Sequence, residues 1–100
     1  MTNQQRVAVE QWTASALKAG VPNHLASGFA LYLVCGIRPG GYCLAVLENN
    51  LREAYAMGDE ASLAGQRKTV TWLWNEVPAS CWGSPEKVAA WKGDSDYVNR

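Results

Sequence analysis

Histidine and cysteine are scarce in this sequence, and their scarcity argues against a metal centre. The chain has one histidine, His24, and three cysteines, Cys35, Cys43 and Cys81. A structural zinc site needs four ligands at characteristic spacings, and no such spacing is present. An odd number of cysteines also argues against a disulfide framework and fits a reducing cytosol. We therefore predict free thiols, no metal and no cofactor.

The sequence also lacks net charge and any long apolar run. Nine lysines and arginines balance nine aspartates and glutamates, whereas proteins that bind nucleic acid without sequence preference usually carry a basic excess. The longest stretch without a charged residue, 19–37, is broken by Gly20, Pro22 and other residues, so we expect no membrane span. The N-terminus is polar and has no signal-peptide core. These absences predict a soluble cytoplasmic protein.

Signatures of catalysis are equally sparse. The glycine-rich stretch 36–41 lacks the lysine and the serine or threonine of a phosphate-binding loop, so a turn with a helix cap is favoured over a phosphate site. A cysteine–histidine nucleophile pair would have to use His24, but a histidine that lines the start of a helix is the simpler interpretation. Arg67 and Lys68 are more typical of a solvated helix face than of a DNA contact. We predict that the protein is not an enzyme.

What the sequence does contain is the pattern of a small all-α protein. Of its 100 residues, 48% are hydrophobic and five are tryptophans, which is enough for one core. The expected helices cover residues 3–19, 22–35, 42–48, 51–57, 60–77 and 85–91. We predict a compact all-α bundle of five or six short helices in a single domain, 1–93, followed by a polar C-terminal tail, 94–100.

Several helix boundaries follow from single residues. Gly20 and Gly36 are expected at the left-handed position that ends a helix, and Asp59 and Ser84 are expected at N-caps. A strand over 29–37 is the alternative to the second helix, because a short apolar run fits either structure. The proline before this run and the glycine after it favour the helix.

Trp72 falls outside the buried stripe that we expect on the helix 60–77. The members of this stripe are Leu63, Val70, Leu73, Trp74 and Val77. Trp72 lies two positions from Val70 and therefore points away from the stripe. Either another helix covers this tryptophan, or it is an exposed aromatic anchor that binds a partner.

Acidic residues are concentrated in the middle of the chain. Glu48, Glu53, Asp59 and Glu60 lie within thirteen positions and are opposed there only by Arg52. One interpretation is that they are helix caps, together with a Glu48–Arg52 pair one helical turn apart. The other is an acidic face that meets a basic surface of a partner. The four acids and the tryptophan above are the candidate partner-binding residues.

Four short motifs carry a resemblance to a known family. The sequence reads G-I-R-P-G at 36–40 followed by A-V-L-E-N-N-L at 45–51, then W-L-W-N-E-V-P at 72–78, and C-W-G-S-P-E at 81–86. In this order and spacing, over about residues 25–91, the chain resembles a family of small proteins of phages, prophages and plasmids. Asn50 stands where that family usually has an acid, and Trp74 where it usually has a tyrosine.

Some members of that family are similar to anti-CRISPR proteins, in particular to an inhibitor of the type I-F RNA-guided surveillance complex. The resemblance implies a protein without catalytic residues that acts in the host bacterial cytoplasm. It would bind protein subunits of the CRISPR-Cas complex and block target DNA binding, with no cofactor, no membrane and no direct contact with nucleic acid. Two other functions stay open, namely a small phage regulator that binds DNA and a structural or interaction domain of a mobile element.

Overall fold

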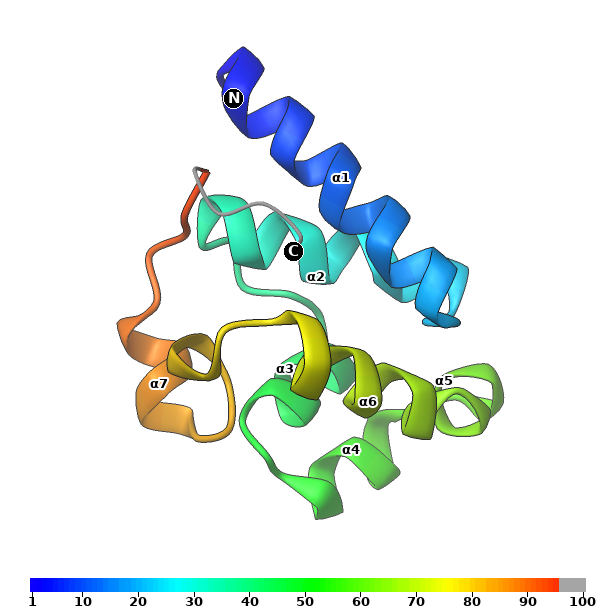
Figure 1. Cartoon of the computed structure of the whole chain (residues 1–100). Helices are drawn as coiled ribbons and strands as arrows, with labels where there is room; N and C mark the ends of the chain where they lie inside the picture. Colours follow the sequence, from blue (N-terminus) through cyan, green and yellow to red (C-terminus); the bar gives the residue numbers. More distant parts are fainter. Residues whose placement is uncertain (96–100) are drawn as a thin grey trace.

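Helices are the only regular secondary structure in residues 1–95, the part of the chain that the computed structural model describes (Figure 1). Their bounds are α1 Asn3–Ala19, α2 Asn23–Cys35, α3 Gly41–Leu47, α4 Leu51–Met57, α5 Glu60–Ala64, α6 Gln66–Glu76 and α7 Pro85–Ala90. One 3-10 turn, η1, covers Ala79–Cys81. The predicted all-α class is confirmed, and most of the alternative strand, 29–37, lies in α2. Within residues 1–95, seven α-helices replace the five or six expected, because one expected helix is divided.

The predicted helix ends at Gly20 and Gly36 are confirmed. Both glycines have left-handed backbone angles, with φ of 97° at Gly20 and 72° at Gly36, where a side chain would be strained. At the N-termini, Thr2 caps α1, and Asp59 and Ser84 cap α5 and α7 as predicted. These caps satisfy backbone groups that a helix cannot satisfy internally. Local sequence therefore determines many of the element boundaries.

The prediction of a single helix over 60–77 is wrong in two respects. It is interrupted at Gly65, which separates α5 from α6. A side-chain carbon at Gly65 would lie 2.7 Å from Cγ of Pro22, so this glycine allows the start of α2 to approach closely. The expected buried stripe is also displaced, because Val70 and Trp74 are 38% and 79% exposed. The buried residues of α6 are Thr69, Trp72 and Leu73, so Leu73, and Val77 just after the helix, are the members of the expected stripe that are buried.

The core is built around α2, which lies between α1 and the group of smaller helices (Figure 1). Seven of the 13 residues of α2 are buried, and this nearly continuous apolar surface explains its central position. An aromatic cluster joins α1, α2 and α6. The ring of Trp72 meets Trp12 at 5.9 Å and Phe29 at 5.8 Å, both edge to face. Such pairs add about 0.5–1.5 kcal/mol each beyond the area that they bury.

After α7, the chain returns to the end of α2. Nε1 of Trp91 donates to two backbone carbonyl oxygens of α2, at 3.1 and 3.2 Å. The N–H of Asp94 donates to Leu33 O at 3.0 Å. The first residue of the predicted polar tail, 94–100, is therefore attached to α2, and residues 96–100 lie outside the described part. Among the helices of residues 1–95, none has the length and apolarity needed to cross a membrane.

Candidate functional site

Glu48, the first of the four predicted partner-binding acids, is engaged within the molecule. Its side chain is 20% exposed, and its Oε2 lies 3.7 Å from Nη2 of Arg38, in the turn before α3. The expected pair with Arg52 is wrong, because Asn49, with a φ of 60°, helps to end α3 before α4 begins. The two side chains do not share one helix, and within residues 1–95 Glu48 forms its ion pair with Arg38.

The other three acids are exposed and lie at helix N-termini. Glu53 is in the first turn of α4, Asp59 is the N-cap of α5, and Glu60 is in the first turn of α5. Acids are favoured at these positions because the N-terminus of a helix carries a partial positive charge. The structure thus gives each acid a role in the fold and leaves each accessible. Their role in binding a partner stays a prediction.

Asp59 also contacts the single histidine. Its Oδ1 accepts a hydrogen bond from the N–H of Ser62 at 2.8 Å, and its Oδ2 lies 3.4 Å from Nε2 of His24. The hydrogen bonds from Ser62, followed by the nearby His24, hold the pKa of Asp59 below its usual value. The same Nε2 lies 3.0 Å from Oγ of Ser62. A catalytic triad needs the acid on one ring nitrogen and the serine on the other, so this cluster is a cap and not a triad.

The pocket beside His24 contains a cysteine that is poorly suited to nucleophilic attack. This pocket has a volume of about 290 Å3, and His24, Tyr42 and Cys43 are among the residues that line it. Burial raises the pKa of Cys43 to about 12, so the thiolate that attack requires is scarce near neutral pH. The hydroxyl of Tyr42 donates to Oε1 of Gln66 at 2.9 Å. The polar groups described here serve hydrogen bonds within the fold.

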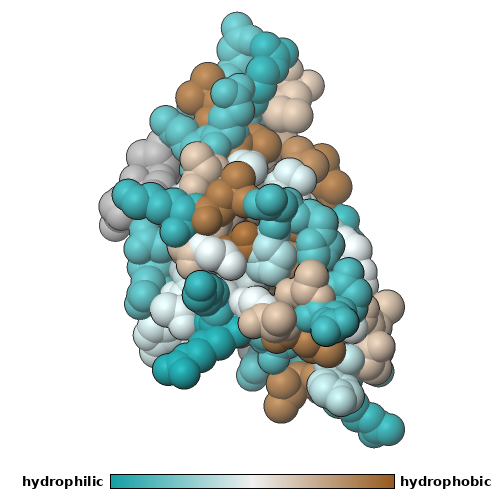
Figure 2. All heavy atoms as spheres, turned by 90° about the vertical axis from the view of Figure 1, so that its right-hand side faces the viewer, coloured by the Kyte–Doolittle hydropathy of each residue, from teal (hydrophilic) through white to brown (hydrophobic). Residues whose placement is uncertain are grey.

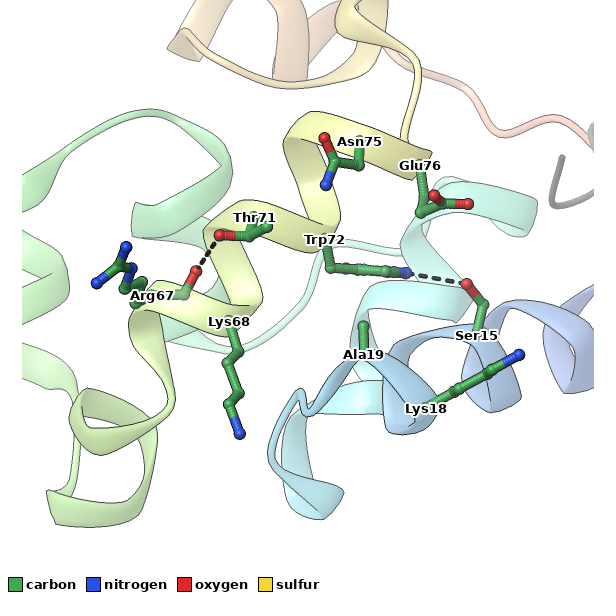
Figure 3. Close-up of a pocket in the computed structure, with 9 residues that line it drawn as sticks. All are labelled: Ser15, Lys18, Ala19, Arg67, Lys68, Thr71, Trp72, Asn75 and Glu76. Carbon is green, nitrogen blue, oxygen red and sulfur yellow. Dashed lines mark hydrogen bonds between the residues drawn. The ribbon is translucent and has the colours of Figure 1, made fainter.

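Trp72 is covered and does not act as an exposed anchor. Its side chain is 1% exposed, and its ring is part of the aromatic cluster of the core. Nε1 of Trp72 donates to Oγ of Ser15 at 3.0 Å, across the space between α6 and α1 (Figure 3). Of the two interpretations of this residue, the one in which another helix covers it is confirmed. The prediction of Trp72 as a partner-binding anchor is wrong, because its apolar area is already used in the core.

The exposed tryptophan is Trp74, which sequence periodicity placed in the core. Trp74 is 79% exposed and lies one turn of α6 beyond Val70, which is 38% exposed. Val70, Leu51 and Trp82 together line a shallow hollow of about 70 Å3 where α4 approaches α6. Leu51 is itself 70% exposed. We refer to Leu51, Val70, Trp74 and Trp82 as the apolar surface.

On one face of the molecule, exposed hydrophobic groups are scattered. On the face shown in Figure 2, hydrophobic groups alternate with hydrophilic ones and do not form one band. Single exposed apolar side chains are normal in soluble proteins. An exposed tryptophan beside further exposed apolar side chains is more typical of a contact site. The apolar surface is therefore the strongest candidate for a binding site in the described structure.

The register of α6 explains why the sequence analysis missed Trp74. The buried positions Thr69, Trp72, Leu73 and Val77 follow helical spacing, but the first of them is polar and was left out of the expected stripe. Oγ1 of Thr69 donates to Gly65 O at 3.1 Å, so its hydroxyl is satisfied inside the core. A search that allowed one buried threonine would have placed Trp74 on the exposed side.

Neither ligand clusters nor comparisons with known proteins assign a chemistry to the chain. Among the described residues, no group of three or more histidine, cysteine, aspartate or glutamate side chains is arranged to hold a metal ion. The chain matches no protein-family model, no curated protein and no solved structure. The resemblance to the family of phage proteins therefore stays a prediction.

Proposed function

We propose that the protein is a non-catalytic inhibitor that acts by binding another protein, the type I-F RNA-guided surveillance complex of a host bacterium. The observation that carries the binding role is Trp74, whose side chain is 79% exposed one turn of α6 beyond the partly exposed Val70. Indole side chains contribute strongly when an interface buries them. The identity of the partner rests on the sequence resemblance to small phage proteins that include such an inhibitor.

The acids supply the second part of the proposal. Glu53 lies on α4 together with Leu51, and Glu60 lies in the first turn of α5. A complex that holds RNA and DNA presents lysines and arginines to the phosphates. Glu53, on the same helix as Leu51, and Glu60, on the following helix, would pair with such cations. The inhibitor and the target DNA would then compete for one basic surface.

The absence of catalysis in this proposal is supported by how the reactive groups are used. His24 meets Asp59 and Ser62 through a single ring nitrogen, and burial keeps the thiol of Cys43 protonated. Neither arrangement produces an activated nucleophile. Inhibition by occupation of a surface needs no such group.

Substitution of Trp74 tests the proposal. Because the site is exposed, Trp74→Gln should change the free energy of unfolding by no more than about 0.5 kcal/mol, while its affinity for the purified surveillance complex should fall at least about tenfold. Val7→Gln is the matched control, because Val7 is 53% exposed on α1, outside the apolar surface. Co-elution and titration with the complex provide the measurement.

The two parts of the proposal can fail separately. If the parent protein does not co-elute with the surveillance complex, the choice of partner is wrong. If the parent co-elutes and Trp74→Gln binds as tightly as the parent, the partner is right and the apolar surface is not the contact.

A further inference from the structure

A groove of about 620 Å3 runs between α1 and α6, and it shares no residue with the apolar surface (Figure 3). Three cations line it, Lys18 from α1 and Arg67 and Lys68 from α6. One acid, Glu76, also lines it. In a chain without net charge, this is a local excess of positive charge that the sequence composition does not reveal.

None of the three cations forms an ion pair within the described residues, where the ion pairs involve other side chains. Lys68 is also positioned by the fold. A side-chain carbon at Gly20 would lie 2.6 Å from Cδ of Lys68, so the glycine that ends α1 makes room for the stem of this lysine. The three charges are therefore available to a ligand.

The head groups of the cations spread around the groove and do not point to one place. In Figure 3, Lys68 and Lys18 extend in different directions, and Arg67 extends away from the ring of Trp72. A single phosphate or carboxylate ion would be met by one of them at most. An extended ligand with several negative charges could meet all three.

Two observations favour an acidic peptide over nucleic acid as that ligand. Binding of single strands relies on exposed aromatic rings for base stacking, whereas Trp72 is 1% exposed and its N–H is already bonded to Ser15. Glu76, which is partly exposed, would repel a phosphate backbone but can accept a hydrogen bond from a peptide N–H. Asn75 offers both a donor and an acceptor to a peptide backbone.

We propose that this groove binds an acidic peptide segment of a protein partner in an extended conformation. Its carboxylates lie against Lys18, Arg67 and Lys68, and its backbone bonds to Asn75 and Glu76. Its apolar side chains lie over the floor between α1 and α6. The inference does not depend on the surveillance complex as a partner, because the groove and the apolar surface are separate.

A labelled peptide of alternating glutamate and leucine tests this inference by fluorescence anisotropy at low salt. The peptide should bind the parent saturably, and neutralising the groove should weaken its affinity at least about tenfold. The groove variant combines Lys18→Gln, Arg67→Gln and Lys68→Gln. The control variant has the same change in net charge outside the groove and combines Arg6→Gln, Arg52→Gln and Lys92→Gln. The control should bind the peptide nearly as tightly as the parent.

A third variant separates the shape of the groove from its charge. Ala19 lines the groove and is exposed, so Ala19→Trp should fill the groove, keep all three cations and weaken peptide binding. Thermal unfolding of each variant shows that it remains folded. The inference is overturned if the peptide does not bind the parent saturably, if the groove and control variants lose affinity equally, or if Ala19→Trp binds like the parent. An oligothymidylate of equal charge that binds the groove more tightly than the peptide would assign it to nucleic acid instead.

Discussion

Gly36 occupies a position where two separate constraints exclude a side chain. Its φ of 72° is left-handed, and a side-chain carbon there would lie 2.7 Å from the backbone oxygen of Lys92. The segment that contains Lys92 is held beside α2 by the bonds of its neighbours, so it cannot easily move away. Gly40, in the same turn, has a φ of -64°, and no atom lies within 4 Å of the place that its side chain would take.

Gly36→Ala should therefore destabilise the protein clearly more than Gly40→Ala. Left-handed strain alone costs about 1–2 kcal/mol, and a loss of about 1 kcal/mol lowers Tm by about 4–8 °C in a domain of this size. The contact with Lys92 should add to that loss. Thermal unfolding followed by circular dichroism provides the measurement. Equal melting curves for the two variants would show that the turn has no architectural role.

At the scale of one element, the cap of α5 makes stability depend on pH. The hydrogen bonds from Ser62, and then His24, lower the pKa of Asp59 in the folded protein. A carboxyl group with a lowered folded pKa stabilises the fold above its unfolded pKa, which is about 3.9 for aspartate. That contribution is lost as the pH falls through the folded pKa. Exposure to solvent keeps the effect small.

Asp59→Asn isolates this contribution, because asparagine keeps an oxygen that can accept the Ser62 N–H but cannot ionise. We expect the parent to lose more stability than Asp59→Asn as the pH falls from about 5 to about 2. Urea unfolding midpoints across that range provide the measurement. Two parallel profiles would show that the charge of Asp59 does not contribute to the cap.

Most helix ends were predictable because their causes are local. Gly20, Gly36, Asp59 and Ser84 act through the backbone of their own turn, and each lies where the sequence analysis placed it. The break at Gly65 has a cause in tertiary structure, the close approach of Pro22. An isolated glycine in a helical pattern is often tolerated, so the sequence alone could not show this break.

The candidate site was predicted less well than the fold, because it depends on the register of α6. Hydrophobicity alone does not distinguish which of Trp72 and Trp74 is buried. The predicted stripe included Trp74 and therefore placed the wrong tryptophan in the core. The close contacts of Trp72 with Trp12 and Phe29 decide the register in the folded protein. These contacts join helices far apart in the sequence, and helical periodicity within one segment does not contain them.

At the scale of the whole molecule, charges of opposite sign gather in different places although the net charge is zero. Exposed acids lie at the N-termini of α4 and α5, and cations that form no ion pair within residues 1–95 line the groove between α1 and α6. Such a molecule has no long-range attraction through net charge. Its electrostatic preference for a partner acts only near contact, within the screening length of about 8–10 Å at physiological salt.

The proposed acidic contact predicts that reversing Glu53 and Glu60 to lysine weakens binding to the surveillance complex. Both side chains are exposed in the first turns of α4 and α5, so stability should change little beyond the lost helix-dipole interaction, about 0.3–1 kcal/mol each. Affinity should fall by about one order of magnitude or more at low salt, and by less at high salt, because contact pairs are screened.

The matched control reverses Glu10 and Glu86, which changes the net charge equally and uses exposed sites on α1 and α7. Glu86 also lies in the first turn of its helix, so part of the dipole effect is matched. Titration of each variant into the complex at two salt concentrations, beside its thermal unfolding, separates binding from stability. Equal losses of affinity in both pairs would mean that total charge matters and position does not. Unchanged affinity in the Glu53 and Glu60 pair would reduce these acids to helix caps and solvated surface, and would leave Trp74 as the basis of the contact.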